Sequence, residues 1–199
     1  MAAFRASLLA VALLVAGCGP HDTPVTKMAP ASPVAVADPD HKLYEQLRAG
    51  IYQLSSAQDS LQTATELSTE LSKKAGGTAS GGFKDLLAKL NSAGQKLGDY
   101  TDELPPFDEF KKDVAGQDDR RLNAIQAGND SLSEMGDADD ILDNLLAGAP
   151  ADFKADVQKI QSDLDDASEA VQSGIVALGG KVEEDDTATP GTAGNNAGG

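Results

Sequence analysis

The chain has 199 residues and a formal charge of −16, because 32 acidic residues outnumber 16 basic ones. This balance argues against nucleic acid or an anionic lipid surface as a partner, since both bind through basic patches. The single cysteine cannot form an intramolecular disulfide, so the fold must depend on packing alone.

Residues 1–17 have the features of an export signal. Arg5 supplies a positive charge, and the residues from Ala6 to Ala16 are almost all apolar. A membrane-spanning helix needs roughly 20 apolar residues. The apolar run here is shorter, so it predicts a signal peptide and not a membrane span.

The apolar run ends in Val15-Ala16-Gly17-Cys18, an aliphatic residue and two small residues followed by the only cysteine. This tetrad resembles the lipobox of bacterial lipoproteins. The resemblance implies cleavage before Cys18 by signal peptidase II, a diacylglyceryl group on its sulfur, and fatty acylation, such as palmitate, of its new amino group. The protein would then be held on a membrane of the cell envelope. Because Gly19 and not Asp follows the cysteine, the class implies the outer membrane, facing the periplasm, in a host with two membranes.

The segments beside the predicted bundle have a different composition. Residues 18–40 contain five prolines without a helical period, which predicts a lipidated tether. At about 3 Å per residue, it could extend roughly 60 Å. Residues 182–199 are acidic and then rich in Gly, Ala, Thr and Asn, which predicts a disordered tail. Without the leader, which contains Arg5 and no acid, the charge becomes −17. This charge favours basic partners or cations, or simply a solvated acidic surface.

Residues 41–181 repeat apolar or small side chains about every 3.5 residues, which predicts amphipathic helices. Glycine and proline clusters separate them, since both residues end helices. The expected helices are 42–75, 82–104, 107–135, a short segment 137–147, and 150–178. No segment has the alternation of a strand.

The sequence therefore predicts an all-α fold, an up-down four-helix bundle with an extra short helix. Phe83 and Phe153 are expected to meet at one end of it. The other end is expected to hold the remaining core aromatics, Tyr44, Tyr100, Phe107 and Phe110. The rival architecture is a dimeric or trimeric coiled coil of long helices, the form of the murein lipoproteins. This chain differs from them in its helix breaks and in lacking their C-terminal lysine.

Most catalytic and metal-binding patterns are missing from the sequence. His21 and His41 lie in the predicted tether or directly after it, so no base is expected beside a serine nucleophile. No Glu-x-x-His motif of a di-iron bundle occurs. The acidic run from Asp137 fails the EF-hand pattern, which needs Gly at its sixth position and Glu at its twelfth. We therefore expect no enzyme activity, no catalytic residue, no metal site and no cofactor.

The third predicted helix carries the least regular apolar stripe, made of Phe107, Phe110, Val114, Leu122, Ile125, Leu132 and Met135. Asp118 and Asn129 interrupt it, and Arg121 lies one turn from Asp118. These three polar residues are predicted to form a polar layer in the core of the bundle, which is the candidate ligand or partner site. The simpler interpretation is a narrower packing face, or polar groups that satisfy one another.

Together these features predict a lipid-anchored envelope protein with a non-catalytic helical bundle. Its role would be structural or adaptor-like, through contacts with an unidentified envelope protein. The alternative is a lipoprotein that binds a small ligand or cation between its helices. A cavity lined by the polar residues of the third helix would favour that alternative, and a centre filled with leucine and alanine would favour the adaptor.

Overall fold

The computed structural model describes residues 38–76, 78–148 and 151–183, and every regular element in these ranges is helical. The elements in chain order are α1 (Pro39–Lys74), α2 (Thr78–Gly98), α3 (Phe107–Phe110), the 3₁₀ helix η1 (Lys111–Asp113), α4 (Val114–Gly148) and α5 (Ala151–Ala177). The predicted leader, the tether up to residue 37 and the tail beyond residue 183 lie outside the described residues. Within the described ranges, no helix combines the length and hydropathy needed to cross a bilayer.

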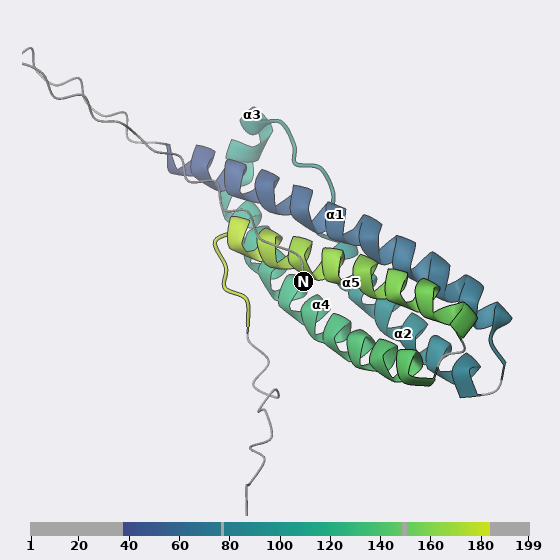
Figure 1. Cartoon of the computed structure of the whole chain (residues 1–199). Helices are drawn as coiled ribbons and strands as arrows, with labels where there is room; N and C mark the ends of the chain where they lie inside the picture. The colour runs from purple at the N-terminus through teal and green to yellow at the C-terminus, as the bar shows by residue number, and fades with distance from the viewer. Residues whose placement is uncertain (1–37, 77, 149–150, 184–199) are drawn as a thin grey trace, which may run out of the picture. The chain divides into compact units, whose positions relative to one another are not determined.

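The four long helices form the predicted up-down bundle with an extra short helix (Figure 1). Each long helix packs antiparallel to the long helix before it, and α5 closes the bundle by packing against α1. Short connections between α1 and α2 and between α4 and α5 favour this arrangement, because a short loop makes successive helices antiparallel neighbours.

Local sequence signals fix where α1 begins and α5 ends. Asp38 caps α1, because its side chain accepts the amide hydrogen of Asp40 at 3.1 Å, and Pro39 fits the first helical turn. The helix therefore begins two residues inside the predicted tether. Gly179 follows α5 with a φ of +79°, a conformation that favours glycine. The amide of Gly180 then donates to the carbonyl of Ile175 at 2.9 Å, the pattern of a Schellman cap.

Leucine and alanine fill the centre of the bundle. Leu47, Leu54, Ala57 and Ala64 of α1 are fully buried. The opposing helices contribute Leu86, Ala93 and Leu97 from α2, Ala138 and Leu142 from α4, and Ile160, Ala167 and Val171 from α5. Successive members of each set are three, four or seven residues apart, as a heptad seam requires.

Two glycines let α1 and α5 approach each other closely. A Cβ atom at Gly50 of α1 would collide with the side chain of Leu178, and one at Gly174 of α5 would lie 3.0 Å from Leu54. Leu54 and Leu178 are fully buried. Each leucine therefore fills the space that a glycine leaves on the neighbouring helix.

The predicted break between residues 135 and 137 is wrong, because α4 is continuous from Val114 to Gly148. The extra short helix is instead α3, which leads through η1 into α4. Leu122 was expected on the buried stripe but is 51% exposed. The buried face of α4 runs through Ala124, Gly128, Ser131, Met135, Ala138, Leu142 and Leu145. Small residues occupy its first half, so the apolar stripe there is too weak to mark the buried face.

Aromatic side chains gather at the end of the bundle where α1 begins. Tyr44 contacts Phe107 and Phe110 edge-on, with ring centroids 5.3 and 5.1 Å apart. His41 is exposed, as expected, and also lies edge-on to Phe107 at 5.1 Å. Tyr100 is half-buried against the same core. The prediction that Tyr44, Phe107 and Phe110 meet at one end of the bundle is thus confirmed.

The close approach of α1 and α5 predicts opposite effects for two glycine-to-alanine changes. Gly50→Ala should destabilise the protein by about 1–3 kcal/mol, because fully buried Leu178 has no space into which to move. The matched control is Gly94→Ala in α2, where a Cβ would meet nothing within 4 Å. That change should stabilise by about 0.5–1 kcal/mol, since alanine is the better helix former. Urea unfolding measures both, and equal effects would contradict the interlocked packing.

Candidate functional site

Asp118 and Arg121 lie near the end of α5 and bind each other. The Nε of Arg121 lies 2.8 Å from Oδ1 of Asp118, and its Nη1 donates to the carbonyl of Leu178 at 2.9 Å. That carbonyl belongs to the residue between α5 and its capping glycine. A cation is favourable there, because the carbonyls at the C-terminus of a helix carry partial negative charge.

Asn129 holds the segment that follows the α5 cap. Its side-chain amide donates to the carbonyl of Lys181 at 3.3 Å and accepts the amide hydrogen of Glu183 at 3.1 Å. Val182 between them packs against the core. The first two residues of the predicted tail are therefore attached to α4.

Arg121 and Asn129 thus form hydrogen bonds to the backbone of the same short stretch, residues 178–183, and Asp118 contributes through its ion pair with Arg121. They do not surround a common space, and none of them lines either cavity described below. A ligand role for Asp118, Arg121 and Asn129 stays a prediction, while their contacts fit the simpler interpretation that polar groups satisfy one another.

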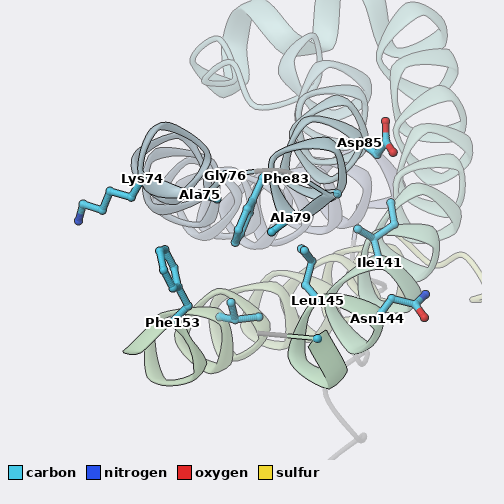
Figure 2. A pocket seen from close by; sticks show the side chains of 13 residues that line it. Lys74, Ala75, Gly76, Ala79, Phe83, Asp85, Ile141, Asn144, Leu145 and Phe153 are labelled. Carbon is cyan, nitrogen blue, oxygen red and sulfur yellow. The ribbon is translucent and has the colours of Figure 1, made fainter. Parts of the chain in front are cut away.

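The larger cavity, about 640 Å³, lies at the opposite end of the bundle from the aromatic cluster, where α1 ends and α5 begins. Figure 2 shows its lining. Its wall combines the end of α1, the start of α2, the end of α4 and the start of α5. The lining residues are Lys74, Ala75, Gly76, Ala79, Gly82, Phe83, Asp85, Ile141, Asn144, Leu145, Gly148, Phe153 and Val157. Phe83 and Phe153 therefore share one end of the bundle, as the sequence predicts.

The lining of this cavity is mostly apolar. In Figure 2, Phe83 and Phe153 lie on two sides of the opening, and Leu145 extends into the space beside them. The charged group of Lys74 extends away from the cavity, as do the polar groups of Asp85 and Asn144. The cavity can therefore shelter hydrocarbon, and the polar ends of Lys74, Asp85 and Asn144 lie outside it.

The smaller cavity, about 230 Å³, lies between α4 and α5. Its lining includes Leu132 and Met135 of α4, Leu164 of α5, and Val182 of the segment held by Asn129. The attached C-terminal segment therefore forms one side of this space.

An ion-pair cluster joins α2 to α4. The ammonium group of Lys89 lies 3.0 Å from Oε2 of Glu134 and 2.7 Å from Oδ2 of Asp137, and Lys96 lies 3.7 Å from Glu134. The hydrogen bond from Lys89 lowers the pKa of Glu134, and hydrogen bonds to Asp137 and Glu134 raise the pKa of Lys89. This geometry indicates a structural role for the cluster, because each charged group faces an opposite charge.

Two further sequence predictions concern lipid and metal. Cys18 and the rest of the lipobox lie outside the described residues. Within residues 38–183, as far as the structure describes them, no group of three or more metal-ligating side chains comes together.

Comparisons of the chain with protein-family models, with curated proteins and with solved structures found no match.

The contacts of Asn129 predict a local effect of its removal. Asn129→Ala should destabilise the protein by about 1 kcal/mol and speed hydrogen exchange of the Glu183 amide, because two hydrogen bonds are lost. Asn123→Ala is the matched control on an exposed position of the same helix. Hydrogen exchange followed by NMR checks both variants. Unchanged exchange at Glu183 in Asn129→Ala would contradict the attachment.

The Lys89 cluster predicts a pH dependence of stability. The pKa of Glu134 is lowered from its ordinary 4.5, so its stabilising effect is present above that pH and disappears as the pH falls below it. The pKa of Lys89 is raised from 10.5, so the stabilising effect of Lys89 on the folded protein is present below that pH and disappears as the pH rises above it.

Glu134→Gln should therefore be less stable than the parent near neutral pH, and the difference should vanish in acid below the ordinary pKa of 4.5. Glu103→Gln, at an exposed position, is the control and should follow the parent at every pH. Thermal unfolding across the acid range measures the difference. A Glu134→Gln deficit that persisted unchanged in acid would contradict this assignment.

Proposed function

We propose that this protein is a lipid-anchored component of the bacterial cell envelope, with a non-catalytic helical bundle that acts as a structural or adaptor module. The observation that carries the proposal is the tetrad Val15-Ala16-Gly17-Cys18 at the end of a short apolar run. Acylation at Cys18 would hold the chain on the membrane, because two or more acyl chains anchor a protein stably where one does not.

The packing of the bundle supports an adaptor over a ligand carrier built around polar core groups. Leucine and alanine fill the centre, and two of the candidate polar residues, Arg121 and Asn129, bind backbone near the end of α5. A partner protein would therefore bind the outer surface of the helices.

The outer surface of α1 and α5 offers two exposed large apolar side chains. Tyr52 is 72% exposed and Val176 is 64% exposed. They lie at the same level on neighbouring antiparallel helices, since Gly50 meets Leu178 on one side of them and Leu54 meets Gly174 on the other. Exposed aromatic residues are frequent hot spots of protein interfaces. We therefore assign the partner contact to this surface.

The net charge of the chain indicates which kind of partner it would attract. The mature chain would carry a charge of −17, since the leader contains Arg5 and no acid. A basic envelope protein would be attracted to such a surface, and complementary charge increases association rates and specificity. If the host has two membranes, Gly19 after the lipobox favours the outer membrane, facing the periplasm.

Mass spectrometry of the mature N-terminus tests the anchor. We expect the chain to begin at Cys18 and to carry a diacylglyceryl group and fatty acyl chains, and we expect it in the membrane fraction. Cys18→Ala should prevent this processing and the membrane attachment. A mature N-terminus elsewhere, or an unmodified thiol at Cys18, would contradict the proposal.

Crosslinking in intact cells tests the adaptor role and its surface. A partner should be crosslinked by the parent and lost with Tyr52→Ser, while Leu122→Ser removes an exposed apolar side chain from α4 as the matched control. Equal loss in both variants, or in neither, would contradict the assignment of this surface.

A further inference from the structure

The apolar cavity at the end of the bundle has no part in the anchor or in the α1–α5 surface. We propose that it binds one long fatty acyl chain of a fatty acid or another single-chain lipid, with the anionic head group at the rim beside Lys74. This inference goes beyond the proposed function, because it concerns a ligand of the bundle and not its attachment or its protein partner.

The shape of the cavity favours a small ligand over a partner helix. All four long helices or their ends contribute to its lining, so it is a pocket at the end of the bundle. A groove for an amphipathic helix would instead run between two helices and accept anchors along its length. The volume of about 640 Å³ falls within the range of roughly 300–1,000 Å³ that is usual for small-molecule sites.

The chemistry of the lining favours hydrocarbon. The hydrocarbon side chains of the lining are those of Phe83, Ile141, Leu145, Phe153 and Val157. The polar ends of Lys74, Asp85 and Asn144 point away from the cavity (Figure 2). A polar ligand would find few hydrogen-bond partners there, and each hydrogen bond to water that is lost without replacement costs about 1–3 kcal/mol. An acyl chain loses none, and its burial is favourable along its whole length.

The rim determines where a charged head group can lie. Lys74, in the last turn of α1, contributes a cation on one side of the opening, and Lys73 precedes it. Asp85 lies on another side and repels an anion. A carboxylate or phosphate therefore fits beside the end of α1, and the flexible side chain of Lys74 can turn to meet it.

A free single-chain lipid fits better than the anchor of the protein itself. Anchors of the lipoprotein class carry two or three acyl chains, and the cavity has room for about one. Withdrawal of the anchor would also expose its remaining chains to water, which is unfavourable in proportion to the area exposed.

Fluorescence of cis-parinaric acid, a naturally fluorescent fatty acid, tests the site. The full chain with Cys18→Ala, which carries no lipid of its own, should bind the probe saturably with one site, and palmitate should displace it. Ala79→Trp fills the cavity and should weaken binding by roughly tenfold or more. Ala49→Trp, at an exposed position of α1, is the matched control and should bind like the parent.

A second variant tests the head-group position. Lys74→Glu should weaken the binding of palmitate by about two- to fivefold, the range of an exposed ion pair. The binding of hexadecanol, which has no charge, should not change. Circular dichroism establishes that each variant is folded. Because Cys18→Ala removes the anchor, failure of the proposed lipidation would not affect this experiment.

Three results would overturn the proposal. One is the absence of saturable binding, and another is binding that folded Ala79→Trp retains in full. The third is binding to Cys18→Ala that disappears in the lipidated protein, since this result would assign the cavity to the protein's own anchor. The proposal would be supported if palmitate displaces the probe, if Ala79→Trp loses binding of the probe, and if the lipidated protein binds the probe as well as Cys18→Ala does.

Discussion

The absence of side chains at Gly50 and Gly174 sets the distance between α1 and α5, and the remaining helices pack against this pair. Leu178 fills the space at Gly50, and Leu54 fills the space at Gly174. Interlocked packing of this kind fixes the register of two helices, because a shift by one residue would drive a leucine into a helix backbone. The same contact places Tyr52 and Val176 at the same level of the bundle, each on the outward face of its helix.

The two ends of the bundle differ because their side chains differ. Where α1 begins, Tyr44, Phe107 and Phe110 fill the space between the helices with contacting rings. At the other end, Phe83 and Phe153 leave a cavity between them. One end is thus closed by packing, and the other contains a mostly apolar cavity.

The sequence predicted the helices whose seams contain large apolar residues, since a repeat of about 3.5 residues identifies a buried face. It failed in α4, where Ala124, Gly128 and Ser131 occupy buried positions and Leu122 is exposed. Small residues are buried there because the neighbouring helix comes close, as Ile175 does at Gly128. Periodicity could place Phe83 and Phe153 at one end, but the cavity between them depends on three-dimensional packing that no single helix encodes.

The most direct test of the bundle is a distance between α1 and α5 in solution. Spin labels on cysteines at exposed positions 52 and 176, in a chain with Cys18→Ala, can be measured by double electron–electron resonance. The interlocked pair predicts one well-defined distance, of about two helix diameters or roughly 20–25 Å, that does not change with protein concentration. A longer or concentration-dependent distance would contradict it and would favour an oligomeric coiled coil of extended helices.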